Sequence, residues 1–512
     1  MASTTALLEG STFWDLVEGR AQATPDAVML VDEHDRTLRF AEFRDAALRV
    51  AAGLHDLGVG PGSKVSYQLP TRFETTLLMA ALARLGAVQN PLVPMYREAE
   101  IAFCLAQTGA ELLITPGAWK EVDYAELAAE ATRGLDTRVH HFAPDLPSGD
   151  PAALPPPPAS GDEVRWIYYT SGTTGSPKGV LHSDASVATS SRGLAERHQL
   201  HSGDVFGVAF PFTHVGGLMN LVSVLVVGHR LVLLETFEPA AAVRVFAREG
   251  VTIIGGGPVF YAAFLAEQRK QPDTPILPNF RMFSGGGAPM PSELHYEVQR
   301  EMGGRGCLHG FGMTECGIVT SNDPDDSDEH LAHTDGRPGL GVELQVQRFG
   351  GGTAAIGEEG PVRLRGAAVC KGYLDPAAHA EAFDAEGWFH TGDVGFRDAD
   401  GYVTLTGRVK DIIIRKGENI SANEIEDLLY AHPNVADVAV IGLPDPARGE
   451  LVCAVVAPTA DAASFDFSEM VAYLRRAQIM PQKIPERLEL VDAIPRNATG
   501  KILKQELRDR FV

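Results

Sequence analysis

The chain has 512 residues, more than one hydrophobic core usually organises, so two or more domains are expected. It carries 67 acidic and 44 basic side chains, which gives a formal net charge of −23. Such an acidic surface repels nucleic acids and anionic membranes, so neither is an expected partner. The five cysteines are scattered without a CxxC pair, which favours buried structural thiols in a reducing cytosol.

The N-terminal residues show no basic segment followed by a long apolar one, so we expect no signal peptide and a cytoplasmic location. The most apolar long stretch, residues 218–234, is interrupted by His229 and Arg230. This interruption favours a buried helix and strand over a membrane span, and no integral membrane segment is expected.

Helical and strand patterns alternate through the first half of the chain. Amphipathic helices are expected at residues 45–57 and 74–85, and short apolar strands at residues 64–69 and 251–254. A helix expected just before the second of these strands, at residues 240–249, repeats the pattern. Such alternation predicts an α/β fold with layered, largely parallel sheets.

The later segments change character. The proline-rich residues 143–162 predict an exposed connector, and residues 322–333 an acidic, polar loop. Alternating apolar residues and Gly-rich turns at residues 341–406 predict a small antiparallel β subdomain. A compact α+β pattern follows, so we divide the chain into an N-terminal domain, residues 1–409, and a C-terminal domain, residues 410–512.

A stretch rich in small residues suggests a phosphate site. Ser, Thr and Gly fill residues 171–176, after an apolar run and just before Lys178. Backbone N–H groups of such a turn can point into one concavity and bind phosphate oxygens, with Lys178 as the compensating charge. Pro177 stands where a Walker A loop needs glycine, so this is a different loop. A mobile surface turn is the alternative.

The full stretch TSGTTGSPKG, residues 170–179, closely resembles the phosphate loop of the adenylate-forming superfamily, which includes acyl-CoA synthetases, peptide-synthetase adenylation domains and beetle luciferases. Further stretches resemble that superfamily's successive motifs in order: SGGGAP (284–289), GFGMTE (310–315), WFHTGD (388–393), GRVKDIIIRKGENI (407–420) and PRNATGK (495–501). Because they span the chain almost end to end, it is identified as a member.

The resemblance implies a large N-terminal α/β domain with a small β subdomain, and a small mobile α+β C-terminal domain. It also implies ATP and Mg²⁺ as cofactors and coenzyme A as co-substrate. The residues it assigns to cofactor binding are Thr170, Ser171, Gly172, Thr173, Thr174, Lys178, Gly287, Ala288, Pro289, Gly310, Phe311, Gly312, Met313, Asp393, Arg408, Lys410, Lys416 and Gly417.

Each assignment also has a physical reason. The small residues 287–289 suit a flat adenine, and Phe311 could stack on it, although ordinary core packing is the alternative. Asp393 can accept hydrogen bonds from both ribose hydroxyls, and Arg408 can donate hydrogen bonds to the ribose or phosphate side of the nucleotide. In the family, Lys410 is the hinge about which the C-terminal domain rotates. Gly417 would leave room for pantetheine.

The residues implied in catalysis are Lys501, Thr314, Glu315 and His214. Thr314 offers a hydroxyl to phosphate, and Glu315 offers the hard oxygen that Mg²⁺ prefers, while a helix cap is the alternative. Lys501 would reach the α-phosphate and the attacking carboxylate, worth roughly 10²–10³ in rate. The alternatives are a solvated tail lysine for Lys501 and a solvated side chain for Lys416.

The acid is expected to be hydrophobic. His214 stands where amino-acid-activating relatives carry aspartate, and resembles the aromatic gate of acyl- and aryl-CoA synthetases; a buried structural histidine is the alternative. Glycines near Val259, Phe260 and Met313 indicate a roomy apolar pocket without arginine, which disfavours malonate-like diacids. Residues 90–103 resemble the branch acting on cyclohexanecarboxylate, steroid side chains and fatty acids.

The expected function is therefore ATP-dependent ligation of a medium or long fatty acid, or of an alicyclic, steroid or terpenoid acid, to coenzyme A through acyl-AMP. One alternative is an acyl-AMP ligase that serves a carrier protein or partner enzyme, disfavoured because no insertion near the hinge is evident. A luciferase-type oxygenase is a weaker alternative, and a non-catalytic nucleotide-binding sensor is another. A homodimer is left open.

Overall fold

The computed structural model describes residues 7–142, 145–170, 177–415, 418–446, 448–459, 465–496 and 502–512. One seven-stranded sheet has the order β15-β14-β13-β11-β12-β1-β2, and every neighbouring pair except β1 and β2 is parallel. Its strands are β1 (Val28–Asp32), β2 (Thr37–Arg39), β11 (Val205–Val208), β12 (Arg230–Leu233), β13 (Ile253–Gly255), β14 (Met282–Gly286) and β15 (Cys307–Gly310).

A second seven-stranded sheet has the order β22-β10-β9-β4-β3-β5-β8. The pairs β22–β10 and β10–β9 are antiparallel and the others parallel. Its strands are β3 (Lys64–Tyr67), β4 (Val88–Pro91), β5 (Leu112–Thr115), β8 (Arg138–His141), β9 (Val164–Tyr169), β10 (Gly179–Ser183) and β22 (Gly372–Tyr373). The prediction of layered, largely parallel sheets is confirmed.

The largest hydrophobic cluster joins apolar side chains of the helices to strands of both sheets. The helices of this part of the chain are α1 (Phe13–Ala23), α2 (Phe40–Asp56), α3 (Phe73–Leu85), α4 (Glu98–Thr108), α5 (Tyr124–Ala131), α6 (Asp184–Arg197), α7 (Val215–Val227), α8 (Pro239–Glu249), α9 (Pro258–Arg269) and α10 (Ser292–Glu301). Helix α7 is buried almost all round, as its continuous apolar sequence requires.

The predicted helices and strands are present with shifted ends. Helix α2 begins five residues before the expected start at residue 45, because Glu42 accepts from the backbone N–H of Arg39 and so caps an earlier first turn. Strand β13 begins two residues after the expected residue 251. The apolar stretch 218–234 supplies most of α7 and all of β12. Within the described residues no helix has the length and apolarity of a membrane span.

The antiparallel β subdomain is confirmed as a four-stranded sheet, β20-β21-β23-β24. Its strands are β20 (Glu343–Val346), β21 (Gly360–Arg365), β23 (Phe389–Arg397) and β24 (Val403–Arg408), and short pairs around it are β16 (Gly312–Met313) with β17 (Gly317–Ile318) and β18 (Thr320–Ser321) with β19 (Arg337–Pro338). The helix within the subdomain is α12 (Pro376–Ala382). A further small pair, β6 (Ala118–Trp119) with β7 (Val122–Asp123), precedes α5.

The expectation of a loop throughout residues 322–333 was wrong. Helix α11 (Asp328–His333) occupies its second half, with Ser327 accepting from the backbone N–H of His330 as the N-cap. Leu331 is fully buried beneath this short helix. The described part of the connector 143–162 is mostly exposed, with one 3₁₀ turn, η1 (Pro151–Ala153), and it packs along α2 where Gly53 leaves no space for a side chain.

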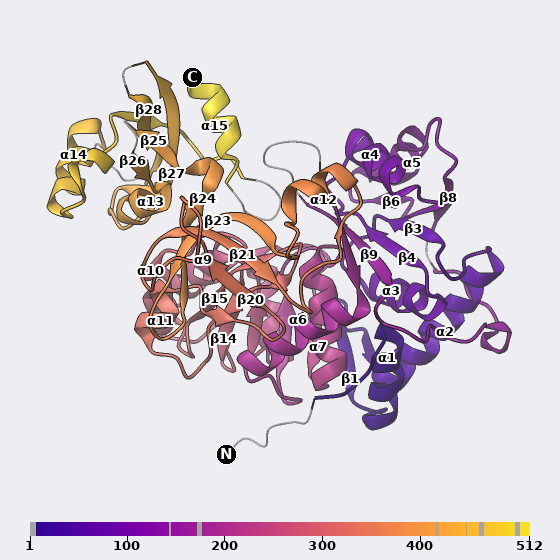
Figure 1. Cartoon of the computed structure of the whole chain (residues 1–512). Coiled ribbons are helices and arrows are strands. Elements are labelled where there is room, and N and C mark those ends of the chain that lie inside the picture. The colour runs from indigo at the N-terminus through magenta and orange to yellow at the C-terminus, as the bar shows by residue number, and fades with distance from the viewer. Residues whose placement is uncertain are drawn as a thin grey trace.

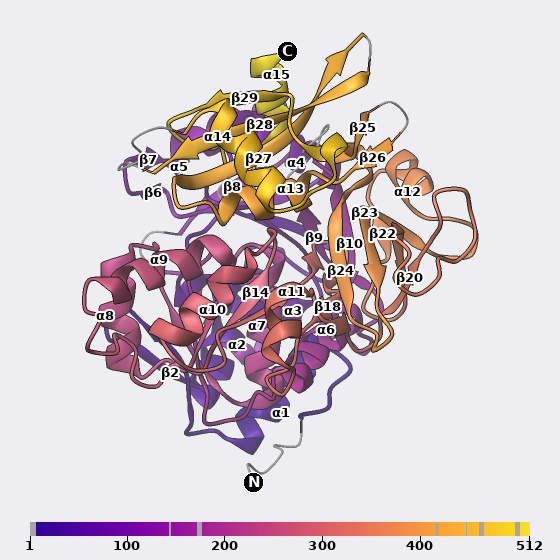
Figure 2. The same ribbon diagram turned by 90° about the vertical axis from the view of Figure 1, so that its left-hand side faces the viewer.

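The C-terminal residues form a separate body beside the large sheets (Figures 1 and 2). It is a mixed sheet with helices, and its core clusters contain only residues after 412. The elements are η2 (Val409–Asp411), β25 (Ile413–Arg415), β26 (Glu418–Ile420), α13 (Ala422–Tyr430), β27 (Val435–Asp445), β28 (Gly449–Pro458), α14 (Phe467–Arg476), η3 (Pro481–Lys483), β29 (Arg487–Leu490) and α15 (Lys504–Phe511). A compact α+β module was expected here; its boundary at residue 410 stays a prediction.

Buried cysteine and histidine side chains affect the stability of the protein. All five cysteines are free and buried, as expected. His229 is fully buried, and neither of its ring nitrogens has a hydrogen-bond partner among the described residues. Burial lowers the pKa of His229 from 6.5 to about 4. Between pH 6.5 and about pH 4, His229 binds a proton in the unfolded chain but not in the folded chain. The free energy of unfolding therefore decreases as the pH falls through this range.

Replacing His229 by leucine should therefore stabilise the protein more at pH 5 than at pH 8. The pH-dependent part of the gain should be about 2 kcal/mol at pH 5, and close to zero at pH 8. Thermal melts of the wild type and the variant at both pH values measure it. His34→Leu is the control, because the His34 side chain is 66% exposed and the same substitution there replaces no buried ring. A gain that does not change with pH would contradict the prediction.

Candidate active site

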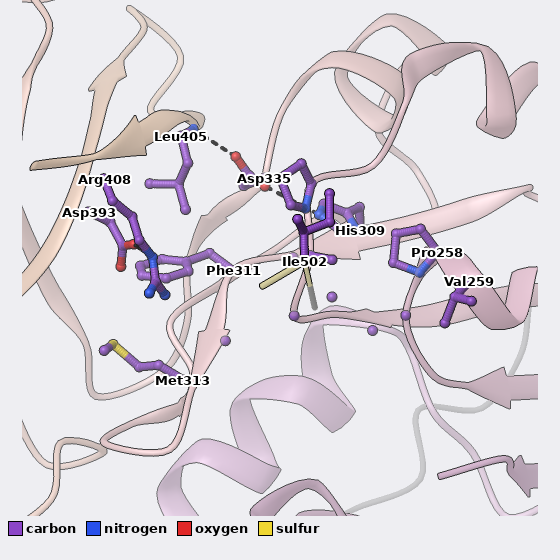
Figure 3. Close-up of a pocket in the computed structure, with 18 of the residues that line it drawn as sticks. Pro258, Val259, His309, Phe311, Met313, Asp335, Asp393, Leu405, Arg408 and Ile502 are labelled. Atoms are coloured by element: carbon purple, nitrogen blue, oxygen red, sulfur yellow. Dashed lines mark hydrogen bonds and ion pairs between the residues drawn. The ribbon is translucent and has the colours of Figure 1, made fainter. Parts of the chain in front are cut away.

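A cavity of about 1200 Å³ lies at the carboxyl ends of the parallel strands β11, β13, β14 and β15. Segments that follow these strands line it, including Phe210 after β11, Pro258 after β13 and Phe311 after β15. Figure 3 shows Pro258 and Val259 on one side of the cavity and Phe311, Asp393 and Arg408 on the other. The carboxyl ends of such strands are the usual place for a ligand in α/β proteins.

Glycines make the floor of the cavity. A Cβ on Gly286 would lie 2.0 Å from the carbonyl oxygen of Gly310, and one on Gly285 would lie 1.9 Å from that of Gly256. Gly287 has a φ of +91°, and a Cβ there would meet nothing within 4 Å. Neighbouring strand ends therefore touch backbone to backbone, and Gly287 opens bare backbone to the cavity, as a flat base requires.

The predicted site residues that the structure describes all line this one cavity. They are Thr170, Lys178, His214, Gly287, Ala288, Pro289, Gly310, Phe311, Gly312, Met313, Thr314, Glu315, Asp393, Arg408 and Lys410. The remaining predicted residues lie outside the described residues; they are Ser171, Gly172, Thr173, Thr174, Lys416, Gly417 and Lys501. The role proposed for each residue stays a prediction.

The base of the predicted phosphate loop is closed by two hydrogen bonds between its ends. The Thr170 N–H donates to the Lys178 carbonyl at 3.1 Å, and the Lys178 N–H donates to the Thr170 hydroxyl at 3.3 Å. Lys178 lies directly before β10, so the sheet fixes the position of its backbone. Its ammonium nitrogen lies 5.2 Å from the centre of the Tyr373 ring, a cation–π contact.

Thr314 and Glu315 are fixed by groups from distant segments. The His182 Nε2–H donates to the Thr314 carbonyl at 2.7 Å, and burial lowers the pKa of His182 to about 4, so this histidine is neutral. The Tyr373 hydroxyl donates to the Glu315 carboxylate at 2.5 Å. Glu315 is only 6% exposed, and burial raises the pKa of its carboxyl.

The surroundings of Glu315 suit a divalent cation. Its carboxylate is buried, and no ion pair to it is found among the described residues. Buried carboxylates are usually stabilised by a cation or by several donors. A hard carboxylate oxygen at the wall of the cavity that Thr314 also lines fits Mg²⁺, which usually takes one or two carboxylates and keeps waters and phosphates as its other ligands.

Asp393 and Arg408 face each other across two strands. They are register partners in the β23–β24 pair, and the Arg408 Nε lies 3.1 Å from an Asp393 carboxylate oxygen. Asp393 is 4% exposed, and its N–H donates to the Thr391 hydroxyl. Figure 3 shows both side chains beside Phe311, which belongs to the apolar core of the β subdomain and also lines the cavity. Core packing and a stacking role are therefore compatible for Phe311.

His214 stands at the start of α7. The Gly216 N–H donates to its Nδ1 at 3.3 Å, which leaves the proton of the neutral ring on Nε2. Burial lowers the pKa of His214 to about 4, so the ring stays neutral at physiological pH. His214 lines the cavity and is only partly buried, so it serves both as the helix cap and as a cavity wall.

Several residues of the site were not predicted from the sequence. Tyr373 donates a hydrogen bond to Glu315, and His182 donates one to Thr314. His309 faces Asp335 at 3.4 Å, and both line the cavity. Burial raises the pKa of Asp335 to about 6. His182 lies on β10, four residues after Lys178, and this nearness in the sequence could have identified it; Tyr373 carried no such signal.

The fold and the cavity define an α/β protein with a glycine-floored cleft of the kind that nucleotides occupy. A family model described as AMP-binding enzyme matches residues 17–374, and one described as AMP-binding enzyme C-terminal domain matches residues 424–501. The chain therefore belongs to the family of AMP-binding enzymes. This confirms the superfamily that the motifs indicated.

Similar proteins cover nearly the whole chain. The medium-chain fatty-acid–CoA ligase of Escherichia coli (strain K12) is 33% identical over 509 residues, covering 96% of this chain and 89% of that protein. A feruloyl-CoA synthase of an Amycolatopsis species is 34% identical, covering 96% of this chain and 97% of that protein. The solved structure of o-succinylbenzoate coenzyme A synthetase from Bacillus subtilis, in complex with ATP and magnesium ion, has a TM-score of 0.84 at 27% identity, covering 96% of this chain and 99% of that chain.

Proposed function

We propose that the protein is an ATP-dependent acyl-CoA ligase for a hydrophobic carboxylic acid. In the first step the acid and ATP give acyl-AMP and pyrophosphate, and in the second coenzyme A displaces AMP. The observation that carries the proposal is that one cavity joins a cationic end at Lys178, a carboxylate–arginine pair at Asp393 and Arg408, and an uncharged apolar wall. The similar CoA ligases support the same reaction.

The first step needs no general base, because the attacking carboxylate is already an anion. Its oxygen attacks the α-phosphorus of ATP, and the bond from that phosphorus to the pyrophosphate oxygen breaks. Negative charge builds on the phosphoryl oxygens, so donors already in place lower the barrier. We assign this role to Lys178, the Thr314 hydroxyl and Lys501. Glu315 would hold Mg²⁺, which when bound neutralises phosphate charge.

The nucleoside part of ATP would lie between the glycine floor and the β subdomain. Asp393 would accept the ribose hydroxyls, with Arg408 neutralising its charge in the absence of the nucleotide. Phe311 and the open backbone at Gly287 would enclose the adenine. These contacts hold the α-phosphorus at a fixed place, so the acid needs only to enter beside it.

The second step is a thiol attack on the acyl carbonyl. The C–S bond forms while the bond from the acyl carbon to the AMP oxygen breaks, and the thiol proton leaves to solvent. We propose that the C-terminal domain turns about Lys410 between the two steps, so that residues 416 and 417 come to line the entry of coenzyme A. Lys410 lies in η2, between the last strand of the β subdomain and β25.

The acid would enter on the side of α7 and α9. The side chains there are uncharged: Phe206, Phe210, Val215, Met219, Val259 and Phe260. An uncharged wall disfavours a second carboxylate or an ammonium group on the substrate, because burying an unpaired charge is costly. This supports a fatty, alicyclic, aromatic or terpenoid acid over an amino acid or a short diacid.

The test is a panel of acids with ATP, Mg²⁺ and coenzyme A. Straight-chain, cyclohexanecarboxylic, steroid and diterpenoid acids are offered, with amino acids as controls, and AMP, pyrophosphate and thioester are measured by mass spectrometry. We expect a CoA thioester with one hydrophobic class and none with amino acids. Pyrophosphate and acyl-AMP without thioester would mean that a carrier protein or partner enzyme is the acceptor. Absence of all products with every acid would contradict the proposal.

A further inference from the structure

Tyr373 comes from a segment remote in the sequence from the residues that it contacts. It ends β22, which pairs with β10 so that Tyr373 lies opposite Val180 and Gly372 opposite Leu181. Strand β10 begins directly after Lys178. The sheet therefore brings Tyr373 to the base of the predicted phosphate loop, with its ring facing the Lys178 ammonium at 5.2 Å.

The same segment donates two hydrogen bonds to Glu315. The Cys370 N–H donates to the Glu315 carbonyl at 2.7 Å, and the Tyr373 hydroxyl donates to the Glu315 carboxylate at 2.5 Å. Tyr373 is 7% exposed and Glu315 6% exposed. A short hydrogen bond between a hydroxyl and a buried carboxylate is strong and directional, so it sets where the remaining carboxylate oxygen points.

Tyr373 also stands between two opposite charges. Lys178 and Glu315 both contact this side chain, yet no ion pair between them is found within the described residues. In a buried site a lysine and a glutamate so near each other attract strongly. The Tyr373 ring makes a cation–π contact with the Lys178 ammonium, and the Tyr373 hydroxyl donates a hydrogen bond to the Glu315 carboxylate. Because each charge has Tyr373 as its neighbour, both stay available to a ligand in the cavity.

We propose that Tyr373 is a positioning residue: it orients Glu315 toward a metal-bound nucleotide and keeps Lys178 from collapsing onto Glu315. This inference rests on the proposed function, since both charges matter only if the cavity binds Mg·ATP. Without the hydroxyl, the Glu315 carboxylate would lose its donor, and the Lys178 ammonium would be drawn to it. Both groups would then be withdrawn from the ligand, while the adenine and ribose side of the cavity would be unchanged.

The experiment compares Tyr373→Phe with a closely matched control. Tyr402 is 6% exposed and donates its hydroxyl to the Asp326 carboxylate at 2.5 Å, outside the cavity. Tyr402→Phe therefore removes the same kind of buried hydrogen bond. Calorimetric titration measures binding of Mg·ATP, and of AMP in EDTA, to the wild type and both variants. Thermal melts show that each variant is folded.

We expect Tyr373→Phe to weaken Mg·ATP binding about 10-fold, the usual loss when a residue that orients a metal ligand is removed, with AMP binding unchanged. Tyr402→Phe should change neither. In a double-mutant cycle, Tyr373→Phe should have little further effect on Mg·ATP binding in the Glu315→Gln background, because the two residues act as one unit.

Three outcomes would overturn the inference while the proposed function stands. If Tyr373→Phe weakens AMP and Mg·ATP equally, the hydroxyl only supports the fold. If the loss is the same with and without Glu315, Tyr373 does not act through Glu315. If Tyr373→Phe binds Mg·ATP as tightly as the wild type does, the inference fails but the proposed function stands. Failure of the wild type itself to bind Mg·ATP would instead overturn the proposed function, and the inference with it.

Discussion

Replacement of Lys501 by alanine should lower the rate of acyl-AMP formation about 100- to 1000-fold. A placed ammonium stabilises the charge that builds on the phosphoryl oxygens in this transition state, and removal of such a donor costs rate by that factor. Thioester formation from supplied acyl-AMP should be retained, because the phosphoryl transfer is then already complete. Pyrophosphate exchange into ATP measures the first step, and thioester mass measures the second.

The described neighbours of Lys501 support this assignment. Lys501 itself lies outside the described residues, but Arg496 and Ile502 on either side pair with each other as an antiparallel bridge, and both line the cavity. Figure 3 shows Ile502 among the cavity residues beside Asp335 and His309. The chain therefore enters and leaves this segment at the cavity wall.

Lys483→Ala is the control for the Lys501 variant. Lys483 belongs to the same C-terminal module, is ion-paired with Glu424 and does not line the cavity. Its replacement should leave both half-reactions unchanged. Equal loss of the two half-reactions in Lys501→Ala would contradict the division of roles, because it would place the lysine in general substrate binding and not in the phosphoryl transfer.

The sequence predicts the parts of the site that are local in the chain. Each motif carries its own turn, strand end and side chain, so residues such as Gly287, Thr314 and Asp393 can be identified from a few neighbours. The parallel sheets then bring strand ends to one edge, which gathers the motifs at one cavity. Recognition of the family supplied the rest of the assignment, and the family is confirmed.

Contacts between distant segments were not predictable in the same way. The Tyr373–Glu315 hydrogen bond joins residues 58 apart, and it depends on β22 leaving the β subdomain to pair with β10 in a different sheet. The register of such a pair is set by tertiary packing, not by the local pattern. Helix α11 was missed for a related reason, because a six-residue helix gains its stability from the burial of Leu331 and not from a long periodic pattern.

Lys410→Pro should slow thioester formation from acyl-AMP about 100-fold while changing acyl-AMP formation little. Proline fixes its φ near −65° and restricts the residue before it, so it would limit rotation at the proposed hinge. The second half-reaction depends on a new placement of the C-terminal domain, and a misplacement of reacting groups by about 1 Å can cost a factor of about 100. Single-turnover assays of each half-reaction measure the two effects separately.

The contacts around Lys410 allow the Lys410→Pro variant to test the conformational freedom of the backbone at this residue. Lys410 lies in η2, and the following Asp411 is held by Arg508 of α15 at 2.7 Å, so the segment after Lys410 is tied to the C-terminal module. Rotation must then occur at or before residue 410. Lys410→Ala is the matched control, because it removes the charge but keeps the backbone free, and it should preserve the ratio of the two rates. A second step that is as fast in Lys410→Pro as in Lys410→Ala would remove this residue from the mechanism and place the rotation elsewhere between β24 and β25.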